Sequence, residues 1–253
     1  MALRQEQRLQ LQESGFVNAG QLFSQDELED ISREYDRLVD ARFQVLGNEH
    51  DGVFPYRAML NYRSELLARV VLHPALVEVA EQFLGRNIRL WWDQGINKPP
   101  GAGSPIPWHQ DNAYQDGAAQ EYLTCWLALD DSDIENGGLQ IFPGSAAAGP
   151  RNHEWHGVHA VIPDEDLPKG EPACLDACAG DVLFFSSLLV HQTQGNGTVD
   201  RHRRAWVVQY SDAAITHSGT GQVYDDRAWV LKDGVIPSSL ESERRHVLSP
   251  DGR

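Results

Sequence analysis

Hydrophobic positions in the first 86 residues recur at the intervals of an amphipathic helix. In the segment QDELEDISREYDRLVDAR the apolar side chains stand three or four residues apart, which places them on one face. Ser24 and Glu27 at its beginning form the capping-box pattern that starts a helix. A second helical pattern covers residues 73–84 and ends before a glycine. We therefore expect residues 1–86 to be a mainly helical part that braces another element.

From residue 87 onward the pattern changes to short runs rich in β-branched and aromatic residues. These runs are IRLWWDQGI, YLTCWLALD, GGLQIFPGS, DVLFFSSLLVHQT and RRAWVVQYSD, and clusters of Gly, Pro, Asn and Asp separate them. Many short strands at this spacing predict a barrel or a jelly roll over residues 87–212. Residues 153–176 read as a loop that forms a lid or an insertion, and residues 213–253 as an irregular tail.

Composition narrows the picture to one domain. The chain has 253 residues, of which 41% are hydrophobic and seven are tryptophan, and this is enough for a sizeable core. Because β-barrels of this size often form one domain, we expect residues 1–253 to be a single domain. No apolar run approaches the roughly 20 residues of a membrane helix, so no membrane partner is expected.

The charge of the chain excludes further partners. A formal net charge of −16 repels nucleic acid and anionic lipid, because phosphate binding depends on clustered Lys and Arg. The same field weakly disfavours a substrate with several phosphates, such as a CoA thioester. We expect a small-molecule substrate that is neutral or cationic, no nucleic-acid partner, and a monomer or a homodimer.

Cysteine usage and the start of the chain bear on the compartment. Cys125, Cys174 and Cys178 form an odd set without CxxC spacing, which indicates neither a disulfide framework nor a zinc site. The polar start MALRQEQRLQLQESG lacks the basic patch and the apolar core of a secretory signal peptide. Both observations predict a protein of the reducing cytoplasm.

A candidate metal site begins in the segment PWHQDNAY. His109 and Asp111 stand two residues apart, so an extended strand would present both side chains on one face. His191 ends an apolar run that would deliver it to the mouth of the barrel. Two histidines and one carboxylate leave open positions on iron(II), which must also bind a keto acid and oxygen. An HxD pair alone is common by chance, so the interpretation depends on what accompanies it.

A basic pair, Arg203 and Arg204, opens another β-rich run about a dozen residues after His191. A buried arginine offers two parallel donors to a carboxylate, as the far end of 2-oxoglutarate requires. Arg203 shares its strand face with Ala205 and Val207, whose small side chains leave room for a cosubstrate. Arg204 would then point outward.

Five ordered blocks between Gln94 and Tyr210 resemble the phytanoyl-CoA dioxygenase family, within the wider jelly-roll 2-oxoglutarate oxygenases. The blocks are INKPPGAG, WHQD, YLTCWLALDD with ENGGLQIFPGS, GDVLFFSSLLVHQT, and RRAWVVQY. The resemblance implies a mainly β fold with flanking helices, namely a double-stranded β-helix (jelly roll, cupin-like). It also implies an Fe(II)- and 2-oxoglutarate-dependent dioxygenase. Such an enzyme uses O2 to hydroxylate or otherwise oxidise a small-molecule metabolite, and releases succinate and CO2.

The resemblance also implies roles for individual residues. His109, Asp111 and His191 look like the iron ligands and so the catalytic residues. Arg203 looks like the partner of the far carboxylate of 2-oxoglutarate, and Thr193 lies two residues after His191 on the same strand face. We expect Thr193 to hydrogen-bond that carboxylate.

Further contacts are expected around the cosubstrate and the substrate. Trp126 looks like a wall of the cosubstrate pocket, and Gln110 and Gln94 are further candidate contacts with the cosubstrate. Trp108 and Tyr114 flank the HQD segment and are expected to face substrate. Lys98 of INKPP is a candidate for contact with an anion, although a lysine at a strand end is more often solvated.

Two details of the motifs bear on the reaction. The family's common PGSH is PGSAAAG here, so the chemistry on the substrate side is expected to differ. Asp111 is present where related halogenases carry a small residue, and this favours hydroxylation or a related oxidation over halogenation.

Alternatives remain for both the metal and the function. His153, His156 and His159 have a spacing that could mimic a metal site, but a period of three does not align three imidazoles on a strand, which favours loop histidines. A non-catalytic cupin-like binding or sensor protein would not need the combination of triad and Arg203. A metal-dependent hydrolase or isomerase on the same fold would not need Arg203 and would turn over without oxygen.

Overall fold

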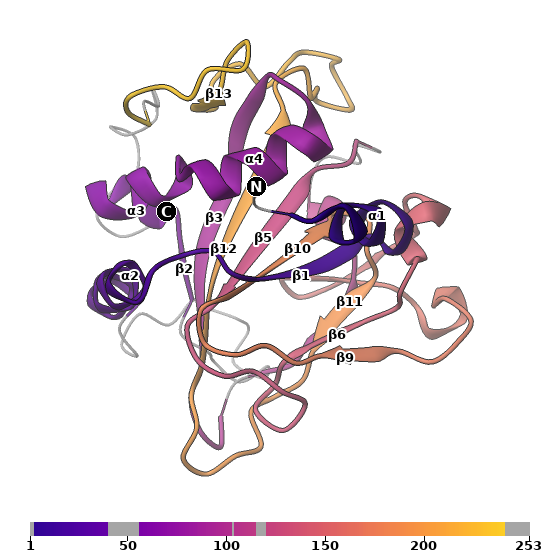
Figure 1. Ribbon diagram of the computed structural model, residues 1–253. Helices are drawn as coiled ribbons and strands as arrows, with labels where there is room; N and C mark the ends of the chain where they lie inside the picture. The colour runs from indigo at the N-terminus through magenta and orange to yellow at the C-terminus, as the bar shows by residue number, and fades with distance from the viewer. Residues whose placement is uncertain (1–2, 40–55, 103, 115–119, 241–253) are drawn as a thin grey trace.

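The computed structural model describes residues 3–39, 56–102, 104–114 and 120–240. Parts of the expected N-terminal helical region and of the expected tail, residues 40–55 and 241–253, lie outside the described residues. Two antiparallel sheets of unequal size form the centre of the molecule, and helices lie against the larger one (Figure 1).

The larger sheet has seven strands in the order β1-β10-β5-β12-β3-β13, with β2 also paired to β3. Their bounds are Phe16–Gln21 (β1), Tyr56–Ala58 (β2), Ile88–Lys98 (β3), Leu123–Ala128 (β5), Asp181–Ser186 (β10), Arg203–Asp212 (β12) and Trp229–Leu231 (β13). The smaller sheet has four strands in the order β4-β11-β6-β9. Their bounds are Ile106–His109 (β4), Leu139–Ile141 (β6), Ala173–Leu175 (β9) and His191–Thr193 (β11). A separate hairpin joins β7 (Glu154–His156) to β8 (His159–Val161).

The two sheets enclose an inner core. Trp126 and Val207 of the larger sheet pack in one cluster with Leu139 and Ile141 of the smaller sheet. Side chains of alternating residues along a strand point to opposite faces, so β3, β5, β10 and β12 also contribute to a second cluster on the outer face of the larger sheet. This two-sheet arrangement confirms the predicted mainly β, jelly-roll fold.

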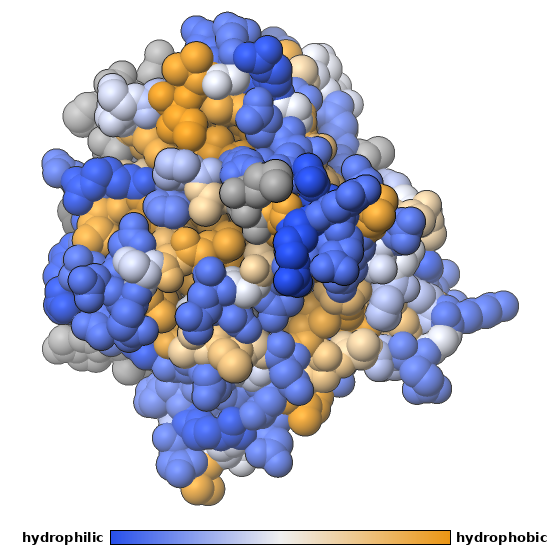
Figure 2. All heavy atoms as spheres, in the orientation of Figure 1, coloured by the Kyte–Doolittle hydropathy of each residue, from blue (hydrophilic) through white to orange (hydrophobic). Residues whose placement is uncertain are grey.

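Helices cover the outer face of the larger sheet (Figure 1). They are α1 (Gln5–Ser14), α2 (Gln25–Leu38), α3 (Glu65–Val71) and α4 (Pro74–Leu84). Short 3-10 turns lie elsewhere along the chain, namely η1 (Leu60–Tyr62), η2 (Asp111–Tyr114), η3 (Ser145–Ala148) and η4 (Asp164–Asp166). Hydrophilic residues dominate their outward surfaces, and hydrophobic residues show between them (Figure 2). The helices therefore bury apolar faces on the sheet, as their amphipathic pattern predicts.

Both predicted helix starts occur where the sequence places them. Ser24 caps α2: its hydroxyl accepts from the Glu27 amide at 3.4 Å, and the Glu27 carboxylate accepts from the Ser24 amide at 2.8 Å. His73 precedes α4, and Gly85 ends it at a φ of 92°, a conformation that glycine adopts without strain. Local capping chemistry thus fixes where these helices begin and end.

Three strands lie outside the predicted β region. β1 and β2 come from the N-terminal part and pair with β10 and β3, and β13 comes from the expected irregular tail and pairs with β3. The division into parts at residues 86 and 212 stays a prediction, although the sheet itself extends beyond those limits. In the described part of the chain, no helix is both long and apolar enough to cross a membrane.

Candidate metal centre and cosubstrate cavity

Three elements bring His109, Asp111 and His191 together. His109 ends β4, Asp111 opens the turn η2, and His191 begins β11, where it lies directly across from His109 in the antiparallel ladder. Asp111 Oδ1 lies 3.5 Å from Nε2 of each histidine. One donor atom from each residue lies within 4.8 Å of the other two. This spacing suits one ion at bond lengths of about 2.1 Å.

The backbone fixes which nitrogen each histidine offers. His109 Nδ1 is 2.7 Å from the Pro107 carbonyl oxygen, and His191 Nδ1 is 2.9 Å from the Leu189 carbonyl oxygen. A carbonyl oxygen can only accept, so each Nδ1 carries the proton and donates it. The lone pair of each Nε2 then faces Asp111 and the space between the rings.

The carboxylate of Asp111 is oriented by two residues that the sequence analysis did not identify. Its Oδ2 accepts from Thr124 Oγ1 at 2.7 Å and from Gln209 Nε2 at 3.0 Å, which leaves Oδ1 for the histidine side. Thr124 and Gln209 occupy inward positions of β5 and β12, two residues from Trp126 and Val207. The available signal was a polar residue among apolar ones, namely Thr124 in β5 and Gln209 after the apolar run of β12.

The protonation states of the cluster suit a cation. Burial tends to raise the pKa of Asp111, but His191 and His109 outweigh it and hold the pKa at about 2. Burial, reinforced by the neighbouring His109, lowers the pKa of His191 to about 4. At neutral pH the site therefore offers an ionised carboxylate and a neutral imidazole, which is the state in which both groups bind metals.

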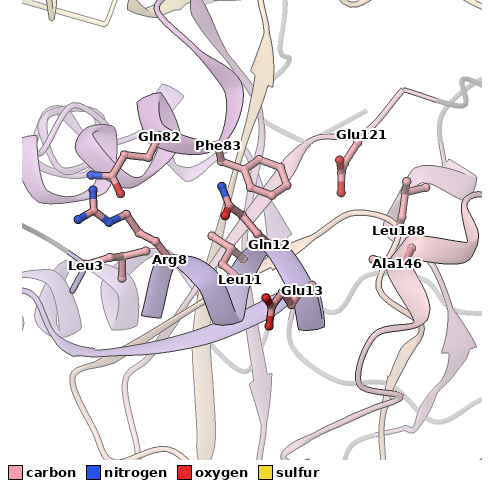
Figure 3. A pocket seen from close by; sticks show the side chains of 12 residues that line it. Leu3, Arg8, Leu11, Gln12, Glu13, Gln82, Phe83, Glu121, Ala146 and Leu188 are labelled. Carbon is pink, nitrogen blue, oxygen red and sulfur yellow. The ribbon is translucent and has the colours of Figure 1, made fainter. Parts of the chain in front are cut away.

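The same cluster lines one end of a cavity between the sheets. The cavity is lined by Gln94, Ile96, Ile106, His109, Asp111, Thr124, Trp126, Leu139, Phe185, His191, Thr193, Arg203, Val207 and Gln209. Most of these residues are inward-facing positions of β3, β5, β11 and β12. A larger cavity lies between α1, α4 and η3, and it contains no member of the triad (Figure 3).

Arg203 lies in the inner cavity as a buried cation. Its side chain is 1% exposed, and its guanidinium lies 5.8 Å from the centre of the Trp126 ring. Among the residues that the structure describes, none hydrogen-bonds to its three nitrogen atoms. Burial lowers its pKa to about 10. A buried charge without a partner is costly unless an anion compensates it, so this residue fits the carboxylate of a cosubstrate.

Arg204 takes the opposite direction, as the strand alternation predicts. Its guanidinium binds both oxygens of Asp130, at 2.9 and 2.7 Å, and both oxygens of Asp36 on α2, at 2.7 and 2.8 Å. Arg203 is a buried cation without a hydrogen-bond partner among the described residues, whereas these ion pairs neutralise Arg204. The structure therefore places Arg203, not Arg204, on the cavity side.

Lys98 is buried, whereas solvation is the more common state of a lysine at a strand end. It is 0% exposed, and its ammonium nitrogen donates to Thr193 Oγ1 at 2.7 Å and to the Gln194 carbonyl oxygen. Burial, followed by the nearby charge of Arg203, lowers the pKa of Lys98 to about 5. Lys98 lies directly across from Arg203 in the β3–β12 ladder. It contacts Thr193, which lines the cavity together with Arg203, but is not itself among the lining residues.

The remaining candidate cosubstrate residues divide into two groups. Gln94 and Trp126 line the cavity, and Gln94 Oε1 accepts from Trp92 Nε1 at 2.9 Å. Gln110 does not line it. Its amide donates to the carbonyl oxygens of Gly149 and Leu188, at 3.0 and 2.6 Å, and accepts from the Arg151 amide at 2.8 Å. These hydrogen bonds hold the Gln110 side chain outside the cavity lining, and its expected contact with the cosubstrate stays a prediction.

Of the two aromatic residues expected near substrate, only one lies beside the cluster. The Tyr114 ring meets the His109 ring edge-to-face at 5.7 Å. Trp108 precedes His109 on β4 and so faces the other way, where it packs on Phe142 at 4.6 Å. Trp108 belongs to a satellite hydrophobic cluster, and its expected contact with substrate stays a prediction.

The loop histidines do not form a metal group within the described residues. His153 Nε2 accepts from the Gln110 amide at 3.0 Å, and His156 and His159 pair across the β7–β8 hairpin. The segment expected as a loop thus contains this hairpin, η4 and β9. The substituted PGSAAAG stretch forms the turn η3.

Comparison with known proteins identifies the family. The family model described as Phytanoyl-CoA dioxygenase (PhyH) matches residues 11–205. The L-proline trans-4-hydroxylase of Streptomyces griseoviridis is 33% identical over 160 residues, which cover 54% of this chain and 60% of that protein. The peroxisomal phytanoyl-CoA dioxygenase of Mus musculus is 29% identical over 244 residues, which cover 86% of this chain and 72% of that protein.

Solved structures agree on the fold. The crystal structure of the non-heme alpha ketoglutarate dependent carbocyclase SnoK, from nogalamycin biosynthesis, superposes with a TM-score of 0.72 at 24% identity. The alignment covers 95% of this chain and 94% of that one. Together with the triad, the buried Arg203 and the family match, this similarity leads to one conclusion: the chain belongs to the phytanoyl-CoA dioxygenase family and is a non-haem Fe(II)- and 2-oxoglutarate-dependent dioxygenase of small molecules.

Proposed function

We propose that His109, Asp111 and His191 bind the iron, and that the cavity between them and Arg203 holds 2-oxoglutarate. The observation that carries this proposal is the buried guanidinium of Arg203, which shares a cavity with the triad and has no hydrogen-bond partner among the described residues. An anion between them would satisfy the guanidinium at one end and the metal at the other.

The cosubstrate end of the cavity has a defined set of donors. Arg203 donates to the far carboxylate of 2-oxoglutarate, and Thr193 donates its hydroxyl hydrogen while its oxygen accepts from Lys98. Behind Thr193, the amine of Lys98 can take up a proton when a carboxylate binds nearby, since an anion raises the pKa of an amine. Trp126 and Gln94 form the walls.

Other residues of the cavity orient the metal-binding carboxylate and exclude water. When bound, iron and 2-oxoglutarate supply the oxidative chemistry, in which the keto acid and O2 yield succinate, CO2 and an oxidised substrate. Thr124 and Gln209 hold the carboxylate of Asp111 in one orientation, as supporting hydrogen bonds do at metal sites. The apolar side chains of Ile106, Leu139 and Phe185 keep bulk water out of the cavity. The carboxylate of Asp111 favours hydroxylation or a related oxidation over halogenation.

The substrate is a small neutral or cationic molecule rather than a CoA thioester. The formal charge of −16 supports this choice, because the field of an acidic protein opposes a substrate with several phosphates. The similarity to an L-proline trans-4-hydroxylase supports a small metabolite as substrate. The similarity to phytanoyl-CoA dioxygenases supports the alternative, a CoA thioester. The free cysteines of the described chain support the reducing cytoplasm. A monomeric or homodimeric state stays a prediction.

Anaerobic addition of iron(II) and 2-oxoglutarate to the metal-free protein tests the proposal. A keto acid chelated to iron(II) gives a weak visible charge-transfer band, and we expect this band to appear with one equivalent of each. Screening of small metabolites by succinate formation then follows. If correctly folded protein binds iron(II) without producing the band, the assignment of the cavity to 2-oxoglutarate is wrong.

A further inference from the structure

Two exposed aromatic rings continue outward from the metal cluster. Tyr114 ends η2, three residues after Asp111, and meets the His109 ring at 5.7 Å with an interplanar angle of 78°. Trp155 of β7 meets the Tyr114 ring at 5.6 Å and 83°. Both contacts are edge-to-face, so the three rings form a continuous series from a candidate metal ligand to the surface.

The β7–β8 hairpin is held in place beside the cluster. The Ala160 amide donates to Tyr114 Oη at 3.3 Å, and the Ile162 amide donates to the Trp108 carbonyl oxygen at 2.8 Å. Trp155 and Ala160 are direct cross-strand partners, and such partners share one face of a hairpin. Ala160 is fully buried on that face, so the indole of Trp155 lies over the side of the hairpin that is turned toward Tyr114.

Neither ring is needed to fill the core. Tyr114 is 44% exposed and Trp155 is 59% exposed, whereas the other Trp, Tyr and Phe side chains of the described residues are buried or half-buried. Large apolar side chains left in water beside a reaction centre are typical of a ligand-binding surface.

The electrostatics of these rings favour a positive ligand. The face of an aromatic ring carries partial negative charge, and Trp and Tyr attract ammonium groups within about 6 Å of the ring centre. Among the described residues, the cationic side chains that stack on rings contact Trp91, Trp126, Tyr224 and Trp229, not Tyr114 or Trp155. The formal charge of −16 adds a field that concentrates cations around the molecule.

We propose that Tyr114 and Trp155 form the substrate-recognition wall of this enzyme, and that the wall binds a positively charged nitrogen of the substrate. This inference rests on the proposed function, because it assigns the rings to the substrate side of the same iron site. It makes Trp155 a specificity-determining residue on an element separate from the iron and 2-oxoglutarate contacts. A substrate with an ammonium group is placed over the rings, with a neighbouring C–H bond toward the cluster.

Choline and its uncharged carbon analogue 3,3-dimethylbutan-1-ol form a matched pair of probes, because they differ in shape very little and in charge by one unit. Binding of each probe to the full-length protein is measured by calorimetry, under anaerobic conditions with iron(II) and 2-oxoglutarate present. We expect choline to bind at least about 5-fold more tightly than the analogue, in line with the strength of cation–π contacts.

Variants of Trp155 separate recognition from folding. Trp155→Leu keeps an apolar side chain but removes the ring, and we expect choline binding to weaken about 2- to 30-fold while binding of the analogue changes little. Trp155→Phe keeps a ring and should restore most of the affinity. Val158→Thr, on the same hairpin, is the matched control and should leave choline binding unchanged.

The visible band of the iron–2-oxoglutarate complex is recorded in the same samples, so the two proposals can fail separately. Equal affinity for the two probes, no binding of choline, or an unchanged affinity in Trp155→Leu would each overturn the recognition wall while a normal band preserves the proposed function. Absence of the band in the wild-type protein would instead overturn the iron and 2-oxoglutarate assignment.

Discussion

Replacement of Arg203 by methionine separates two effects of one buried charge. Methionine has a similar length and is apolar, so Arg203→Met removes the guanidinium from the cavity without opening a large void. Two charge-assisted hydrogen bonds to a carboxylate contribute about 3–5 kcal/mol. Their loss should raise the dissociation constant of 2-oxoglutarate about 100- to 4000-fold, since 1.4 kcal/mol corresponds to a factor of ten.

The same substitution should make the protein without 2-oxoglutarate more stable. All three guanidinium nitrogens lack partners among the described residues, so the folded chain carries the desolvation cost of a cation. Removing that cost should raise the free energy of unfolding by about 1–3 kcal/mol. A residue with a merely structural role would lower stability when replaced, so the opposite signs of the two effects identify a ligand-binding arginine.

The affinity is measured by anaerobic titration of the charge-transfer band with 2-oxoglutarate, and the stability by chemical denaturation of the metal-free protein. Arg204→Met is the matched control, because its ion pairs with Asp130 and Asp36 lie on the outer face. It should lower stability and leave the 2-oxoglutarate affinity within about threefold of the wild type. If Arg204→Met weakens 2-oxoglutarate binding more than Arg203→Met does, the assignment of the two arginines is reversed.

Three further predictions concern the metal cluster and the core. His191→Ala should abolish iron(II) binding in calorimetry while the far-ultraviolet circular dichroism stays native, and retained stoichiometric binding would contradict the ligand assignment. Thr124→Val removes a hydrogen bond to Asp111 Oδ2 and should weaken iron(II) binding about 10- to 100-fold, whereas an unchanged affinity would show that Gln209 alone orients the carboxylate. Asp93 is fully buried, and burial raises its pKa to about 6, so its protonated form is favoured by folding. Protonated Asp93 therefore stabilises the folded protein by about 3 kcal/mol below about pH 4, and this stabilisation is lost as the pH rises through about 6. Asp93→Asn should remove this part of the pH dependence of the free energy of unfolding, measured by denaturation.

Local signals in the sequence were sufficient for the elements that local chemistry determines. The capping box at Ser24 predicted the start of α2, and the alternation along β12 predicted that Arg203 faces inward while Arg204 faces outward. The spacing of His109 and Asp111 predicted that both side chains reach one site, although the expected strand ends at His109 and Asp111 lies in the turn η2. Each of these features depends on residues that are close together in sequence.

Features that depend on distant partners were missed or misjudged. β1 pairs with β10, whose residues are more than 160 positions away, and nothing in FVNAGQ itself indicates that pairing. Thr124 and Gln209 acquire their role only because Asp111 arrives beside them. For Trp108 the signal was present, since the alternation along β4 turns it to the side opposite His109.

The ion-pair network of Arg204 also bears on how the enzyme can change. It ties α2 to the back of the strand whose front carries Arg203, so the cosubstrate end of the cavity is built on the larger sheet and its helical cover. The β7–β8 hairpin at the other end belongs to neither of the two main sheets and exposes Trp155. Substitutions in the hairpin can alter substrate choice at little risk to the oxidative chemistry, which makes this short segment the natural place for the enzyme to acquire new substrates.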